Sequence, residues 1–142
     1  MRYAARMMSL DCTPLENALA QLEEGLHEAG RQPASELLRD GVIQRFEYTH
    51  ELALKFIRRA LETGFGDVVD EMLYNDVLRT AAERGLINDV QAWFEYRTAR
   101  NKTSHTYDAK VAADVFRAAQ PFLEHVRFLL RRLHALNDTS AA

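Results

Sequence analysis

Apolar residues recur along the chain at intervals of three and four positions, the spacing that places side chains on one face of an α-helix. The pattern predicts four main helices and a short one. Their expected ranges are 13–30, 35–64, 75–85, 88–100 and 108–136. No segment alternates apolar and polar residues long enough to predict a strand. The expected fold is therefore all-α, an up-and-down helical bundle.

The expected helix ends carry residue types that satisfy free backbone groups. Thr13 is expected to be an N-cap, with Pro14 at the first helical position and Glu16 completing a capping box. Gly85 is expected to stop the short third helix. Pro121 is expected to kink the last helix, because its ring removes one backbone hydrogen bond. These positions agree with the helices that the apolar pattern predicts.

A length of 142 residues with 47% apolar residues is typical of one compact domain. We expect residues 1–12 to be an N-terminal extension, residues 13–136 to form the bundle and residues 137–142 to be a frayed tail. No apolar run exceeds three residues, so neither a transmembrane helix nor a membrane partner is expected. The single Cys12 excludes a disulfide framework and favours a cytoplasmic location.

Charge is distributed unevenly along the chain. The 18 Lys and Arg residues are outnumbered by 21 Asp and Glu residues, and the net charge of -3 argues against coating nucleic acid with the whole surface. Residues 11–39 carry six acidic and two basic residues, and residues 63–96 carry seven and two. Residues 97–110 reverse this balance, with four basic residues and one acidic residue. Any site for a polyanion is therefore expected in that segment.

Glu47 and His50 lie three positions apart on the second expected helix, the spacing that di-iron bundles use. Such a site needs a second Glu-x-x-His, which the sequence lacks, so no metal is expected. We expect Glu47 and His50 to form a polar pair within the bundle. Motifs for phosphate loops, dinucleotide binding and serine hydrolysis are absent too, and no cofactor is expected. Asp67 and Asp70 lack the Gly-Ser turn of a nucleotidyltransferase metal site.

Basic, histidine and tyrosine side chains gather in residues 100–107, between the fourth and last expected helices. A histidine can take a proton from a ribose 2′-hydroxyl or give one to a leaving 5′-oxygen. An arginine can hold a phosphate and neutralise charge in the transition state. These residue types suit RNA cleavage without a metal, with Arg100 and His105 as catalytic groups. The alternative is structural: both side chains serve helix ends, and Asp108 is the N-cap of the last helix.

The segment contains one histidine, whereas cleavage needs a base on one side of the phosphate and an acid on the other. Two copies related by a twofold axis would supply both groups. The catalytic interpretation therefore predicts a homodimer in which Arg100 and His105 of each subunit line a shared cleft.

Three segments resemble those of a known family in order and spacing. They are Asp40 to Lys55, with sequence DGVIQRFEYTHELALK, then Arg84-Gly85-Leu86-Ile87 followed by Trp93, then Arg100 to Asp108, with sequence RNKTSHTYD. Over about residues 15–136, the chain resembles the nucleotidyltransferase substrate-binding protein family, in the HepT-like branch of the HEPN superfamily. The resemblance implies a dimeric HEPN-like bundle. It also implies the toxin of a toxin–antitoxin system of the MntA/HepT type, encoded beside a minimal nucleotidyltransferase (MntA-like) antitoxin.

The resemblance assigns roles to individual residues. The Arg-x4-His-x-Tyr ribonuclease motif of HepT-like toxins maps onto Arg100, His105 and Tyr107, with Asn101 and Lys102 as supporting residues. The partner would transfer AMP to Tyr107, and the added charge and bulk would keep RNA away. The older family name implies another job, in which the chain is a non-catalytic subunit that presents a substrate to a nucleotidyltransferase.

Overall fold

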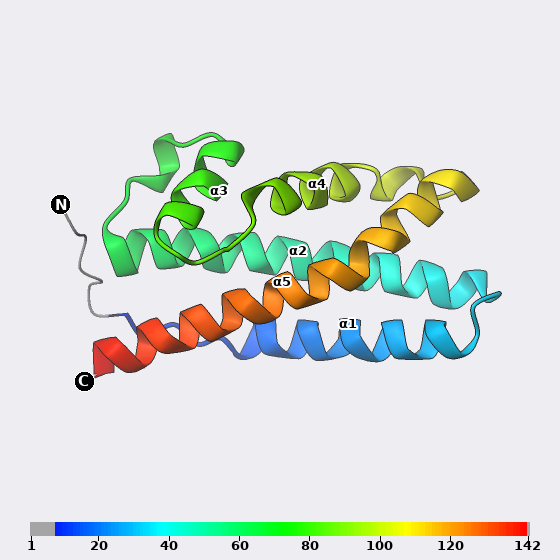
Figure 1. Cartoon of the computed structure of the whole chain (residues 1–142), viewed down its shortest axis with the longest axis horizontal. Helices are drawn as coiled ribbons and strands as arrows, with labels where there is room; N and C mark the ends of the chain where they lie inside the picture. Colours follow the sequence, from blue (N-terminus) through cyan, green and yellow to red (C-terminus); the bar gives the residue numbers. More distant parts are fainter. Residues whose placement is uncertain (1–7, 142) are drawn as a thin grey trace.

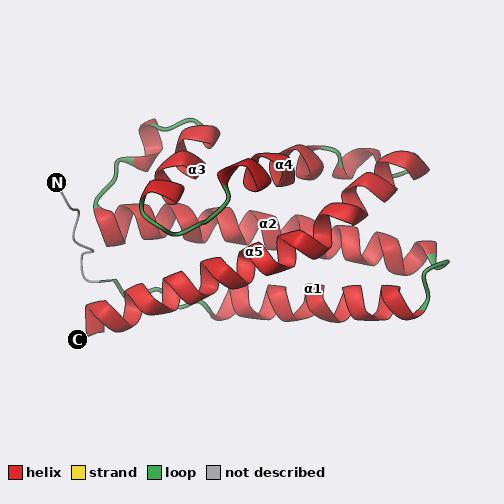
Figure 2. Cartoon of the chain, in the orientation of Figure 1, coloured by secondary structure: helices red, strands yellow, loops and turns green. Residues whose placement is uncertain are grey.

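A computed structural model describes the backbone of residues 8–141 and the side chains of residues 8–138. These residues form five α-helices and two single-turn 3-10 helices, and none of them lies in a strand (Figure 2). The elements are α1 (Thr13–Arg31), α2 (Glu36–Phe65), η1 (Val69–Glu71), α3 (Tyr74–Glu83), α4 (Val90–Asn101), η2 (Thr103–His105) and α5 (Ala109–Ala141). The all-α prediction, with four main helices and a short one, is confirmed.

The four long helices run alternately up and down the bundle (Figure 1). α1 and α2 form a hairpin, and α5 packs against both of them. α4 contacts α2 and α5, while the short α3 contacts α2 and α4. The arrangement places α3 and α4 along α2, and it brings the junction of α4 and α5 beside the first half of α2.

Aromatic rings from three helices meet at the centre of the core. Phe46 of α2, Trp93 of α4 and Phe122 of α5 are fully buried. The ring centroids of Phe46 and Phe122 lie 4.8 Å apart, and those of Trp93 and Phe122 lie 5.7 Å apart, both in edge-to-face geometry. Such pairs stabilise a core beyond the burial of their area. This cluster fixes α4 against α2 and α5, and so fixes the segment that follows α4.

The starts of α2 and α4 carry side-chain caps, and the starts of α1 and α3 differ from the prediction. Ser35 Oγ accepts from the amide of Leu38 at 3.1 Å, and Asp89 Oδ1 accepts from the amide of Ala92 at 3.0 Å. The N-cap of α1 is Cys12 rather than Thr13, because Asp11 bonds the Thr13 amide at 3.0 Å and the helix starts one residue earlier. α3 starts at Tyr74, one residue before the expected range of 75–85, and its N-cap Leu73 makes no side-chain cap bond.

The end of α2 depends on two glycines. The sequence predicts an end at Gly64, but the helix continues to Phe65, and Gly66 then takes the left-handed φ of 75°. Gly64 is buried, and a Cβ at this position would lie 3.2 Å from the sulfur of Met8. Gly64 therefore serves close packing, while Gly66 stops the helix as glycines at this position commonly do. Gly85, with φ of 77°, follows α3 as expected.

Both ends of the described chain pack on the bundle. Met8 and Cys12 are buried in the core. The Asn137 side chain on α5 makes two hydrogen bonds with the backbone of Leu10, accepting from its amide at 3.0 Å and donating to its carbonyl at 2.9 Å. Residues 8–12 thus pack beside residues 13–136, and α5 continues to Ala141, whereas the rest of the expected extension and tail, residues 1–7 and 142, lies outside the described residues.

In the part of the chain that the structure describes, no helix is both long enough and apolar enough to cross a membrane.

Candidate functional site

The segment from Arg100 to Tyr107 joins α4 to α5 at one end of the bundle (Figure 1). Arg100 lies in the last turn of α4, and His105 ends the single turn η2. Asp108 then caps α5, since its Oδ1 accepts from the amides of Lys110 at 2.9 Å and Val111 at 3.3 Å. This part of the structural alternative is confirmed: Asp108 holds the start of α5, and it orders the segment from its far end.

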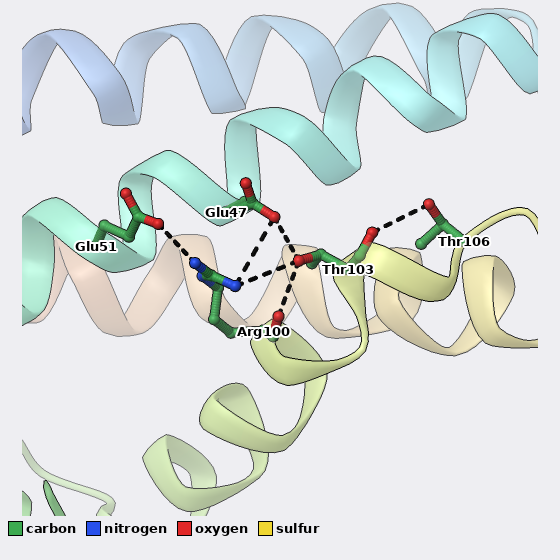
Figure 3. A network of polar contacts seen from close by, with 5 residues as sticks. All are labelled: Glu47, Glu51, Arg100, Thr103 and Thr106. Carbon is green, nitrogen blue, oxygen red and sulfur yellow. Dashed lines mark hydrogen bonds and ion pairs between the residues drawn. The ribbon is translucent and has the colours of Figure 1, made fainter.

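Arg100 pairs with two carboxylates of α2 (Figure 3). Its Nη2 donates to Glu51 Oε1 at 2.6 Å, and its Nη1 lies 3.9 Å from Glu47 Oε2. Glu47 and Glu51 are four positions apart, so both side chains project from one face of α2. The side chain of Arg100 is 32% exposed. It is therefore oriented by the neighbouring helix while one part of it still faces solvent.

Thr103 connects the Glu47 carboxylate to the turn after α4. It is 9% exposed, and its hydroxyl lies within hydrogen-bond distance of Glu47 Oε2 and, at 2.8 Å, of the Arg100 carbonyl. The single hydroxyl proton serves one of these acceptors at a time, while Thr103 Oγ1 accepts from Arg100 Nη1 at 3.4 Å. Thr106 Oγ1 donates to the Thr103 carbonyl at 3.3 Å. The network in Figure 3 thus fixes both Arg100 and the turn that leads to His105.

The expected polar pair of Glu47 and His50 is wrong, because each side chain has a different partner. Glu47 bonds Thr103 and lies near Arg100, whereas His50 Nε2 is 2.9 Å from the hydroxyl of Tyr74 on α3. The two residues share a face of α2, but their partners come from different elements: Thr103 lies in η2 and Tyr74 in α3. Among residues 8–138, no three His, Cys, Asp or Glu side chains gather as metal ligands would.

His105 and Tyr107 lie together at the surface. Their ring centroids are 6.0 Å apart, and Tyr107 is 80% exposed. Asn101 and Lys102, the supporting residues expected from the resemblance, are exposed as well. In the described part of the chain, no hydrogen bond joins His105 to Arg100. The structure therefore brings the motif residues to one exposed junction, with Arg100 oriented from α2 and His105 open to solvent.

His50 is the other histidine near Arg100, since both line one pocket. Burial, together with smaller contributions from the charges of Arg100 and Arg97, lowers the pKa of His50 to about 4. Its ring is therefore neutral at physiological pH and is hydrogen-bonded to Tyr74. A group with so low a pKa is a poor proton acceptor near neutrality. His50 therefore does not fit the role of the second acid or base that the catalytic interpretation requires.

Sequence reasoning missed Glu47, Glu51 and Thr103 as site residues. The carboxylates had a signal, the i, i+4 spacing of two acids on a helix next to a basic segment. Thr103 had none, because a threonine in a polar turn is common, and its partner Glu47 is 56 positions away.

The fold and the site define a class: an all-helical bundle that exposes an Arg-x4-His-x-Tyr motif where two helices meet. The family model described as "Nucleotidyltransferase substrate binding protein like" matches residues 10–135. The chain belongs to this family, as its resemblance implied, and to the HepT-like proteins within it.

Known relatives agree with this assignment. The chain is 41% identical over 100 residues to a Haemophilus influenzae protein named "Probable ribonuclease HepT", a match that covers 69% of this chain and 68% of that protein. A solved Haemophilus influenzae structure, described as the fold of a substrate binding domain of a nucleotidyltransferase, has a TM-score of 0.78 and 32% identity, covering 87% of this chain and 99% of that one. A solved structure from Thermus thermophilus has a TM-score of 0.70 and 31% identity, covering 84% and 98%.

Proposed function

We propose that this protein is a metal-independent RNA endonuclease, the toxin of a toxin–antitoxin pair, with Arg100 and His105 as catalytic groups at a homodimer cleft. The observation that carries the proposal is the arrangement at the α4–α5 junction. There an arginine is oriented by two carboxylates, and an exposed histidine and tyrosine follow it in the motif. The name of the Haemophilus relative, a probable ribonuclease, supports the same chemistry.

The reaction needs two proton transfers. His105 of one subunit takes the proton of the ribose 2′-hydroxyl, whose oxygen attacks the adjacent phosphorus. The bond from phosphorus to the 5′-oxygen breaks, and His105 of the second subunit protonates that oxygen. The products are a 2′,3′-cyclic phosphate and a 5′-hydroxyl. Arg100 stabilises the charge that builds on the phosphoryl oxygens.

The carboxylates around Arg100 set a condition for substrate binding. Glu51 already occupies Nη2 of the guanidinium, so an incoming phosphate must displace it or share the remaining donors. The Glu51 side chain is exposed, and it can move into water at little cost. Glu47 is more enclosed and bonds Thr103, so it keeps Arg100 in place while Glu51 gives way.

The proposal includes control by a nucleotidyltransferase partner, the MntA-like antitoxin. The partner would transfer AMP from ATP to Tyr107: a bond forms between the phenol oxygen and the α-phosphorus, and pyrophosphate leaves. The exposed hydroxyl of Tyr107 can reach another protein's active site. The added phosphate would place negative charge beside His105 and repel RNA. The free thiol of the buried Cys12 is in keeping with the cytoplasmic location we propose.

The ribonuclease proposal is tested with the chain purified alone and a labelled single-stranded RNA. Wild type is expected to cleave with EDTA present and to leave 2′,3′-cyclic phosphate ends. His105→Ala is expected to lose about 100-fold to 10,000-fold in rate. His27→Ala, which changes an exposed histidine on α1, is the matched control and should cleave like wild type. Equal rates for His105→Ala and wild type would refute the assignment.

The second candidate is a non-catalytic subunit that presents a substrate to a nucleotidyltransferase. The description of the Haemophilus structure favours it. It predicts that wild type leaves RNA intact and that the partner transfers nucleotide only to a molecule bound by this chain. Mass spectrometry after co-expression separates the two: AMP on Tyr107, absent from Tyr107→Phe, supports the toxin proposal.

A further inference from the structure

A second group of basic side chains lies in a pocket between α2, α3 and α4. The pocket has a volume of about 640 Å³, within the range of ligand-binding clefts. Its five basic side chains come from α2 and α4: Lys55, Arg58, Arg59, Arg97 and Arg100. Glu51 and Glu62 are the carboxylates that line it. The pocket is therefore positive on a chain whose net charge is -3.

The cations of α2 lie on the side of the helix that faces the pocket, because Arg58 and Arg59 follow Lys55 by three and four positions. Lys55 and Arg59 are exposed, and Arg58 is half-buried. Within residues 8–138, none of the three takes part in an ion pair. Their charge is available to an anion that enters the pocket.

Arg97, one of the two cations that α4 places in the pocket, is held by neighbouring side chains. The Arg97 guanidinium lies 4.2 Å from the centroid of the Tyr74 ring, in a cation–π contact, and its Nη1 donates to Asn75 Oδ1 at 3.2 Å. Tyr74 is in turn bonded to His50. Because His50 is neutral and Tyr74 keeps its proton, this wall adds no charge that would oppose an anion.

We propose that this pocket binds backbone phosphates of a single-stranded RNA whose scissile phosphate lies at Arg100 and His105. Arg100 lines the pocket and is also part of the proposed cleavage site, so one RNA strand can pass from the pocket to the scissile position. From Lys55 to Arg59 the cations span about 6 Å of helix axis, a row that suits a chain of phosphates better than a single one. The inference rests on the proposed ribonuclease function for the identity of the ligand, and it adds a binding site for the strand beside the scissile bond.

The test measures RNA binding without cleavage, in the full-length His105→Ala protein, by the anisotropy of a short fluorescent oligoribonucleotide. Arg58→Gln with Arg59→Gln is expected to weaken binding at least tenfold. The slope of log K against log salt concentration should become shallower by about 1.4, because each lost phosphate contact on a single strand is worth about 0.7. The matched control is Arg31→Gln with Arg131→Gln, which removes the same charge from exposed positions on α1 and α5 outside the pocket.

The control pair is expected to change affinity less than threefold. Equal affinities and slopes for the pocket pair and the control pair would overturn the inference, because only overall charge would then matter. Lys55→Gln, at an exposed position, is measured in parallel so that a folding defect in the pocket pair does not decide the result; its slope should fall by about 0.7. An unchanged slope there also counts against the pocket.

Cleavage by wild type is scored separately from binding. If wild type cleaves RNA and the pocket pair binds like the control, this inference fails and the ribonuclease proposal stands. If wild type does not cleave but binding depends on Arg58 and Arg59, the ribonuclease proposal fails and the phosphate pocket stands.

Discussion

Replacing Thr103 with valine tests the network that holds the candidate site. Valine keeps the shape of threonine but removes the hydroxyl that bonds Glu47 and the Arg100 carbonyl. At 9% exposure, Thr103 leaves little room for water to take over these contacts. The variant should therefore fold, but with a looser turn between α4 and α5.

The size of the effect follows from the bonds that are lost. A hydrogen bond to a charged group contributes about 1.5–3 kcal/mol. The Glu47 side chain is 39% exposed, so water partly replaces the donor, and we expect a loss of about 1–2 kcal/mol. With an unfolding entropy of about 2.1 cal/mol/K per residue over 142 residues, this lowers Tm by about 3–7 °C.

Thermal denaturation followed by circular dichroism measures the shift. Thr106→Val is the control, because that hydroxyl makes one bond to a backbone carbonyl at 3.3 Å and should matter less. A double-mutant cycle with Glu47→Ala should give a coupling free energy of at least about 0.5 kcal/mol between the two residues. A Thr103→Val protein as stable as wild type, or a coupling of zero, would refute the network.

Three further predictions concern charged and titrating side chains. Arg100→Lys keeps the charge but loses the planar group that contacts both carboxylates, so RNA cleavage should fall about tenfold to 100-fold, measured as kcat/KM. His50 has a folded-state pKa of about 4, below its usual 6.5, so the unfolded state binds more protons between these values. Stability should therefore fall by about 3 kcal/mol as pH drops from 6.5 to 4, and urea unfolding of His50→Gln should lack this component. Asp67 and Arg84 form an ion pair at 2.6 Å with both side chains 12% exposed, so Asp67→Ala should cost about 2–4 kcal/mol, and an unchanged Tm would contradict this.

Features that depend on near neighbours in the chain could be predicted from sequence. Ser35 and Asp89 cap their helices because an N-cap needs only the backbone three positions on. Asp108 is a third example. The error at Thr13 has the same local origin: Asp11 competes for the Thr13 amide, and two neighbouring polar residues cannot be ranked by type alone.

Features that depend on which helices meet could not be predicted. Glu47 and His50 share a helix face, yet their partners come from the turn after α4 and from α3, and this depends on how those helices pack. The basic pocket was missed for the same reason. Lys55 and Arg58 are about forty positions from Arg97 in the sequence, so a count of charge along the chain does not group them. The fold places all three around one cavity.

The two hydrogen bonds between Asn137 and Leu10 span 127 positions and bear on the order of folding during synthesis. Contacts so distant in sequence form late, because the intervening chain must first be ordered. Phe122 belongs to the same final helix, so a nascent chain that ends before α5 leaves Phe46 and Trp93 without the ring that packs against them. Since α5 also anchors the turn that carries His105, the chain can assemble its candidate cleavage site only after α5 has been synthesised.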